Sequence, residues 1–211
     1  MPAKKSASCT KWPKHRFTFP ASRDGATGPT VTTDAPMRFN SVVTLRSCLE
    51  SAFSQSGTTV TAFLEQLAGE PVDAHERHHA MIEAGMANFL GVEEGHPLLQ
   101  RSAVLQGRRS MQPYAHVESL LVPSRLPAGF CRQLETGNDP IGRILCKDGI
   151  AFTRSELPGL DRGRALVLCD SPVPEDYLFA RTYRIDLDGV AVILISEWFL
   201  RVLESLLGPE R

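Results

Sequence analysis

The chain lacks several features that would assign it to a class of protein at once. It has no run of roughly 20 apolar residues, so the sequence predicts no membrane-spanning helix. The formal net charge of the 211 residues is −1, which gives no electrostatic case for a nucleic-acid or membrane-surface partner. The five cysteines are odd in number and form no C-x-x-C, which favours reduced thiols over a disulfide framework or a zinc cluster. We therefore expect a cytoplasmic protein.

Residues 1–36 differ in kind from the rest of the chain. Lysines and arginine stand among Ser, Thr, Pro and Gly without apolar periodicity, and the apolar core of a secretory signal is missing. An organellar transit peptide fits less well, because prolines and Asp24 and Asp34 interrupt the segment. We interpret residues 1–36 as a disordered tail or an over-extended start, and residues 37–211 as one domain.

From Met37 onward the apolar pattern predicts an α+β domain, with an antiparallel sheet and helices to one side. A hairpin closes the domain, because glycine in Asp188-Gly189 accepts the positive φ that a tight turn needs. The strands of this hairpin are predicted at 179–185 and 190–198, and further strands at 98–105, 114–122 and around 150–154. Helices are predicted at 42–53, 127–134 and 199–207, and either a helix or a strand at 60–67.

Residues 71–88 are polar, with helical propensity from Ala and Glu, and contain a literal match to H-E-x-x-H at 75–79. On a helix, His75 and His79 would share a face and could bind zinc. Arg77 and His78 suit a solvated face instead, and no third ligand follows, so we favour a polar helix. The cluster at 107–110 could bind an anion, but a solvated hairpin loop is the favoured interpretation.

Two charged residues stand inside apolar strands. Glu197 follows the apolar run of residues 190–195, and a charge there is costly to bury unless it is paired. It is either at a frayed strand end or functional. Arg101 is either a rim residue that pairs with a neighbouring carboxylate or an inward fork for a bound carboxylate. Spacing alone favours the interpretation of Arg101 as a rim residue.

Four segments in one order resemble the chorismate–pyruvate lyase family, in its 4-hydroxybenzoate-forming branch of bacterial secondary metabolism. They are Leu99-Gln-Arg-Ser-Ala-Val-Leu105, Tyr114-Ala-His-Val-Glu-Ser-Leu-Leu121, Asn138-Asp-Pro-Ile-Gly-Arg143, and Arg181-Thr-Tyr-Arg184 with Ser196-Glu-Trp-Phe-Leu200. The resemblance covers roughly residues 40 to 205. It implies a six-stranded antiparallel sheet with helices packed on it around an internal ligand cavity. It also implies an enzyme that eliminates pyruvate from chorismate without metal or organic cofactor.

The resemblance implies roles for five residues. Arg101 would grip the ring carboxylate of chorismate, and Glu197 would face the oxygen of the departing enolpyruvyl group. Ile141 and Gly142 stand where the family's Pro-Leu-Gly turn supplies a backbone N–H to the ligand carboxylate. Val60 stands where some members have a pocket methionine, which alters the shape of the pocket. Residues 157–176 match poorly, so no lid residue is assigned there.

The residue types fit this chemistry. Apolar neighbours such as Ile195 and Trp198 would favour the protonated form of Glu197, which could then act as general acid. An arginine fork and a backbone N–H suit a carboxylate in a dry site.

Two alternatives stay open. The same sheet architecture resembles the ligand-sensing domain of bacterial winged-helix repressors, which binds small effectors without catalysis. Those chains carry an N-terminal helix-turn-helix, and residues 1–36 offer none. The second alternative is a secondary-metabolism enzyme acting on another small acid. The oligomeric state and the hydroxybenzoate isomer are left open by the sequence.

Overall fold

The computed structural model describes residues 59–85, 88–136, 138–157, 160, 165–169 and 172–206, together with Ser47. The interpretation of residues 1–36 and the predicted helix at 42–53, except for helical Ser47, lie outside the described residues. Within the described part of the chain, no helix is both long and apolar enough to cross a membrane.

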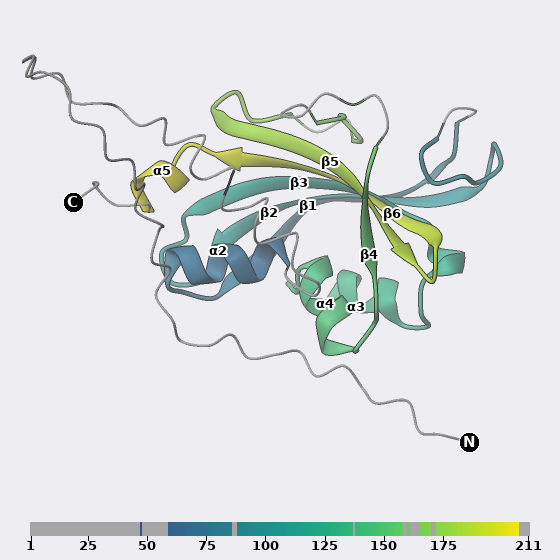
Figure 1. Cartoon of the computed structure of the whole chain (residues 1–211), viewed down its shortest axis with the longest axis horizontal. Helices are drawn as coiled ribbons and strands as arrows, with labels where there is room; N and C mark the ends of the chain where they lie inside the picture. The colour runs from purple at the N-terminus through teal and green to yellow at the C-terminus, as the bar shows by residue number, and fades with distance from the viewer. Residues whose placement is uncertain are drawn as a thin grey trace, which may run out of the picture.

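Six strands form one sheet in the part of the chain that the structure describes, in the order β1-β2-β3-β6-β5-β4 (Figure 1). Every neighbouring pair is antiparallel, which confirms the six-stranded antiparallel sheet. The strands are β1 (Val72–Glu83), β2 (Pro97–Gly107), β3 (Pro113–Leu121), β4 (Thr153–Glu156), β5 (Tyr177–Leu187) and β6 (Val190–Leu200).

The closing hairpin forms as the sequence predicts. Asp188 and Gly189 have φ values of 49° and 80°, and two positive φ angles in succession are what a two-residue hairpin turn of type I′ requires. The β6 residues from 192 to 199 are all buried, as expected for an apolar strand covered on both faces.

The helical prediction for residues 71–88 is wrong, because this segment forms β1 and pairs with β2. Val72 and Ala74 pack into the core, and this burial and the ladder hydrogen bonds outweigh the weak helical propensity. A β-bulge between Glu76 and His78 shifts the register by one residue. His75 and His79 therefore lie on opposite faces of the sheet. No cluster of three or more metal-ligating side chains is found among the described residues.

Three helices lie against one face of the sheet: α2 (Val60–Ala68), α3 (Phe130–Thr136) and α4 (Ile141–Lys147) (Figure 1). The Thr59 hydroxyl caps α2 by accepting a hydrogen bond from the Ala62 N–H at 3.1 Å, and Gly69 ends it with a φ of 68°. This settles the alternative at 60–67 in favour of a helix. A single 3-10 turn, η1 (Pro123–Arg125), precedes α3. The predicted C-terminal helix is shorter than expected, since β6 continues to Leu200 and α5 spans only Leu203–Leu206.

The covered face of the sheet carries two separate apolar clusters. One joins α2 to the sheet through residues such as Leu64, Leu105 and Phe199. The other joins α3 and α4 to the sheet through residues such as Ile144 and Ile193. The helices thus cover the two ends of this face more fully than its middle.

The segment 165–169 packs on the opposite face. The buried Glu118 carboxylate accepts hydrogen bonds from the N–H groups of Leu168 at 2.6 Å and Cys169 at 3.1 Å. The Thr182 hydroxyl accepts one from the Leu166 N–H at 2.8 Å. These side chains of β3 and β5 hold residues 166–169, within the poorly matching segment 157–176, on the face away from α2, α3 and α4.

The loop at 107–110 binds a carboxylate of the chain itself. The N–H groups of Arg109 and Ser110 donate to Glu70 at 2.7 and 3.0 Å, and the Tyr114 hydroxyl donates to the same side chain at 2.8 Å. The side chains of Arg108 and Arg109 are largely exposed, as the favoured interpretation of a solvated loop predicts.

Acid is expected to weaken the fold through Glu70. Hydrogen bonds from Ser110, and then from Tyr114 and Arg109, lower the pKa of Glu70 from 4.5 to about 2, although desolvation acts in the opposite direction. A depressed carboxyl pKa contributes stability above pH 4.5 that is lost as the pH falls from 4.5 toward 2. Glu70→Gln should remove this contribution to the pH dependence.

Urea unfolding of the Glu70→Gln variant at several pH values between 2 and 7 measures the effect. The control is Glu94→Gln, which changes an exposed glutamate and should keep the pH dependence of the parent chain. Identical pH dependence in the parent and the Glu70→Gln variant would contradict the prediction.

Candidate active site

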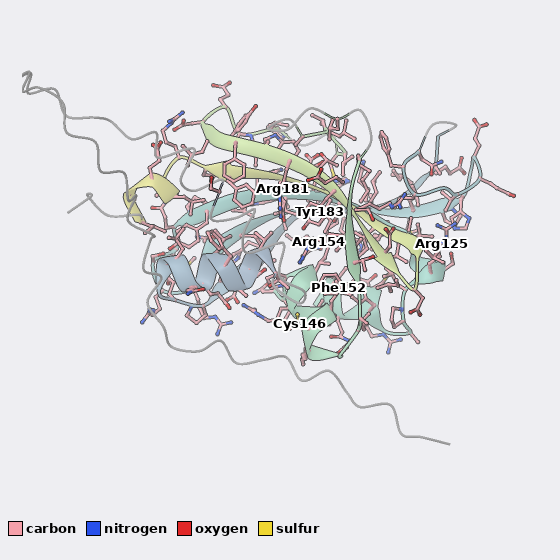
Figure 2. The ribbon with its side chains drawn as sticks, in the orientation of Figure 1. Arg125, Cys146, Phe152, Arg154, Arg181 and Tyr183 are labelled. Carbon is pink, nitrogen blue, oxygen red and sulfur yellow. The ribbon has the colours of Figure 1, made fainter. Side chains whose placement is uncertain are left out.

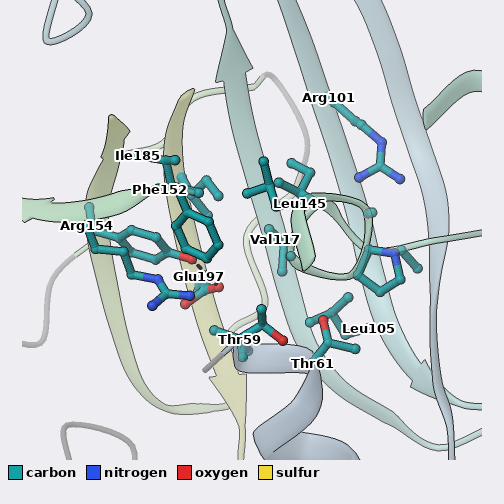
Figure 3. Close-up of a pocket in the computed structure, with 18 residues that line it drawn as sticks. Thr59, Thr61, Arg101, Leu105, Val117, Leu145, Phe152, Arg154, Ile185 and Glu197 are labelled. Atoms are coloured by element: carbon teal, nitrogen blue, oxygen red, sulfur yellow. Dashed lines mark hydrogen bonds between the residues drawn. The ribbon is translucent and has the colours of Figure 1, made fainter. Parts of the chain in front are cut away.

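A cavity lies in the middle of the helix-covered face, between the sheet and the first residues of α2 and α4. It encloses about 510 Å³ of empty space, part of which is open to solvent. All five residues singled out from the sequence line it: Val60, Arg101, Ile141, Gly142 and Glu197. Most of the remaining lining is apolar, with Leu105, Val117 and Leu145 among the side chains in Figure 3.

The strand register explains why Arg101 and Glu197 meet the same space. Arg101 on β2 pairs with Ser119 on β3, and Ser119 pairs with Ile195 on β6. Glu197 lies two residues beyond Ile195, and side chains two residues apart share a face. One strand and two residues separate the two positions, which corresponds to roughly 12 Å between their Cα atoms. Both long side chains can therefore reach one small ligand.

Arg101 pairs with a neighbouring carboxylate and also lines the cavity. Its Nε donates to Glu76 Oε2 at 3.0 Å, because the β1 bulge brings Glu76 next to it. Only 2% of Arg101 is exposed, and among the described residues its Nη2 has no hydrogen-bond partner. Burial lowers the pKa of the Arg101 guanidinium, while Glu76 opposes this shift. A buried guanidinium with an unused N–H beside a cavity is suited to a carboxylate.

Glu197 is not at a frayed strand end, since it is 3% exposed and paired on both oxygens. Arg181 Nε donates to Oε2 at 2.7 Å, and Arg181 Nη2 lies 2.6 Å from the same oxygen. The Tyr183 hydroxyl donates to Oε1 at 3.0 Å. Both partners are opposite or near Glu197 on the neighbouring strand β5. This pairing supplies what a buried charge requires.

The expected apolar surroundings of Glu197 are only partly present. Ile195 lies on the same face and lines the cavity with it. Trp198 was expected beside the carboxyl group, but adjacent strand residues alternate between faces. Its ring lies on the other side of the sheet, edge-on to His116 at 5.7 Å between centroids.

Tyr183 and Arg181 fix the position of the Glu197 carboxylate. Burial, and then the charge of Glu197, raise the pKa of Tyr183 well above its usual value, so the hydroxyl remains a donor. The Arg181 guanidinium lies over the Tyr183 ring at 4.6 Å from the centroid. Each partner thus restrains the other as well as Glu197.

The first residues of α2 and α4 form the opposite wall of the cavity. Pro140 is the N-cap of α4, and Ile141 and Gly142 are its first residues, whose N–H groups lack partners within a helix. A Cβ on Gly142 would lie 2.7 Å from Thr59 Cβ, so only glycine allows α4 to approach the cap of α2 this closely. Val60 begins α2 and is 5% exposed.

Sequence reasoning missed several residues of this site. Glu76 was considered only as part of a zinc motif, and Arg181 and Tyr183 only as parts of a segment that carries the family resemblance. Phe152 and Arg154 line the cavity from the β4 region, which showed only a weak strand pattern and no signal of function. Figure 2 shows Arg154, Tyr183 and Arg181 grouped near the centre of the molecule.

The fold and the site define a class: an α+β protein with a small, largely apolar cavity beside a buried arginine and a buried glutamate. Such a cavity is suited to binding a small organic acid and moving a proton on it. A family model described as "Chorismate pyruvate-lyase Rv2949c-like" matches residues 55–207, and the chain belongs to this family. The family resemblance found in the sequence is thereby confirmed.

Curated relatives include proteins named chorismate pyruvate-lyase from Mycobacterium tuberculosis and Mycobacterium bovis. Each is 32% identical over 111 residues, which cover 49% of this chain and 53% of the relative. The chain thus spans about half the length of the curated relatives it matches.

Two solved structures are also similar. A GntR-family transcriptional regulator from Bacillus cereus has a TM-score of 0.40 at 14% identity, covering 62% of this chain and 92% of that chain. PhnF from Mycobacterium smegmatis has a TM-score of 0.44 at 18% identity, covering 68% of this chain and 64% of that chain.

Proposed function

We propose that this protein is a lyase that eliminates pyruvate from chorismate and releases 4-hydroxybenzoate, without a cofactor. Membership of the chorismate pyruvate-lyase family supports the substrate class. The observation that carries the proposal is that one cavity contains both a cationic and an anionic side chain, each buried. A buried guanidinium with an unused N–H, as far as the described residues go, shares that cavity with a buried carboxylate held by two donors.

In this proposal, Arg101 binds the ring carboxylate of chorismate. Its Nε is already bound to Glu76, so Nη2 is oriented before the ligand arrives. The N–H groups of Ile141 and Gly142, at the start of α4, add donors from the opposite wall. Charge-assisted hydrogen bonds in a cavity of low polarity are stronger than the same contacts in water. Val60 shapes the wall beside them.

Glu197 is proposed to move the proton that the reaction requires. Chorismate and the two products contain the same atoms, so neither water nor a second substrate is consumed. The ring carbon that bears the hydroxyl group loses its hydrogen as a proton to Glu197, and the adjacent carbon–oxygen bond breaks as the ring becomes aromatic. Glu197 then acts as the general acid and returns the proton to the methylene carbon of enolpyruvate, which becomes pyruvate. Arg181 and Tyr183 hold the carboxylate in place.

Incubation of the full chain with chorismate tests the proposal. Pyruvate and 4-hydroxybenzoate should form in equal amounts. Pyruvate is measured by its reduction with lactate dehydrogenase, and 4-hydroxybenzoate is measured by chromatography. Chorismate without protein controls for spontaneous decay. A tight complex without turnover would replace the lyase by a non-catalytic effector-binding protein. Absence of both binding and turnover would point to another small acid.

A further inference from the structure

The cavity contains a second arginine, Arg154, on the side away from Arg101. Figure 3 shows Arg154 and Glu197 together on one side and Arg101 on the other. Arg101 belongs to β2 and Arg154 to β4, and three strands lie between them in the sheet order. A ligand that fills the cavity therefore has a guanidinium near each end.

Two aromatic rings fix the Arg154 side chain at the cavity wall. Its guanidinium carbon is 5.0 Å from the ring centroid of Phe152 and 5.9 Å from that of Tyr183. Contact with aromatic faces stabilises a guanidinium and restrains its position. Phe152 and Tyr183 line the cavity as well, so part-buried Arg154 lies between two aromatic rings at the cavity wall.

Tyr183 also links Arg154 to the proposed reaction centre. The hydroxyl of this tyrosine donates to Glu197 Oε1 at 3.0 Å, and the ring carries Arg154 at its face. Arg154 therefore lies beside the carboxylate that would handle the proton of the departing group, and far from the arginine that would hold the ring carboxylate.

The charges of the cavity favour a dianion. Among the described residues, two arginines and one glutamate line it. One guanidinium on each side of the cavity suits a ligand with two carboxylates. A ligand with a single carboxylate bound to Arg101 would make no contact of this kind with Arg154. Chorismate has a second carboxylate, on the enolpyruvyl group, whereas 4-hydroxybenzoate does not.

Building on the proposed function, we propose that Arg154 binds the carboxylate of the enolpyruvyl group and so distinguishes substrate from product. When the carbon–oxygen bond breaks, negative charge develops on the enolpyruvyl fragment, and a guanidinium fixed beside it stabilises that charge. The aromatic product keeps its contact with Arg101 and makes none with Arg154.

Comparison of a dianionic with a monoanionic ligand tests this assignment in the full chain. The dianion is 3-[(1-carboxyvinyl)oxy]benzoate, which has both carboxylates but a ring that is already aromatic; the monoanion is 4-hydroxybenzoate. In Arg154→Gln, the Kd of the dianion should rise about 30-fold or more, and that of the monoanion should change less than about threefold. Arg154→Lys keeps the charge but loses the planar guanidinium, so its Kd for the dianion should lie between those of the parent chain and Arg154→Gln. In each variant, kcat/KM for chorismate should fall by about the same factor as the Kd of the dianion rises.

The control Arg132→Gln removes an exposed arginine of α3 and should change neither Kd. The assignment is overturned if Arg154→Gln weakens both ligands equally, if it weakens neither, or if the parent chain binds the dianion no more tightly than the monoanion. These binding arms need no turnover. The proposed function fails instead if the parent chain forms no pyruvate from chorismate, and this result does not depend on the two Kd values.

Discussion

Replacement of Glu197 by glutamine is expected to lower kcat for chorismate by about 10²- to 10⁴-fold, the usual contribution of a positioned acid–base group. Glutamine has nearly the same size, and its amide oxygen can still accept a hydrogen bond from Tyr183 or Arg181. It cannot take up and return a proton at neutral pH. The Kd of 4-hydroxybenzoate should therefore change far less than kcat.

Steady-state kinetics with chorismate and calorimetric titration with 4-hydroxybenzoate separate the two effects. The matched control is Glu83→Gln, which removes an exposed carboxylate at the end of β1 and should keep the parent kcat. A parent-like kcat in Glu197→Gln would remove this residue from the mechanism. Parallel losses of kcat and product affinity would give it a role in binding instead.

The sheet and its closing hairpin could be predicted because their signals are local. The two-residue turn at Asp188-Gly189 requires positive φ, and the apolar run that follows it requires cover on both faces. β2 and β3 alternate clearly enough to be found from the sequence, within a residue or two of their ends. The five residues assigned through the family resemblance all line one cavity.

The contacts of the site could not be predicted, because they depend on β-bulges. Extrapolation from the pair Leu187–Val190 at the turn would place Ala180 opposite Glu197. A bulge at Ile185 and Asp186 shifts the register by one residue and places Arg181 there instead. The shift moves a guanidinium to the face of the buried carboxylate. The local sequence contains no pattern that predicts this bulge.

The same reason explains the error at residues 71–88. The propensity of Ala and Glu for helix is worth only tenths of a kcal/mol per residue, whereas β1 gains a full ladder with β2 and buries Val72 and Ala74. The bulge in β1 then brings Glu76 to Arg101. A histidine-rich segment that suggested a zinc helix thus supplies the anion that holds the cavity arginine.

Replacement of Arg101 by methionine is expected to weaken chorismate and 4-hydroxybenzoate alike, because both have the ring carboxylate. Loss of one partner of a buried, hydrogen-bonded charge pair costs about 2–5 kcal/mol. This corresponds to a rise in both Kd values of roughly 30- to 5,000-fold. Methionine fills much of the space of the arginine stem, and the 34% exposed Glu76 side chain can turn to water, so the fold should persist. Titration with both ligands and the unfolding midpoint provide the measurements.

A double-mutant cycle with Glu76→Gln decides between the two roles of Arg101. If Arg101 acts only through its ion pair with Glu76, either single change removes that ion pair, and the affinity losses of Arg101→Met and Glu76→Gln should be equal and not additive. If Arg101 binds the ligand through Nη2, Glu76→Gln should cost less than about tenfold, since the glutamine oxygen can still accept from Nε. Arg101→Met should then carry nearly the whole loss, and Arg132→Met on α3, where the side chain is exposed, none of it.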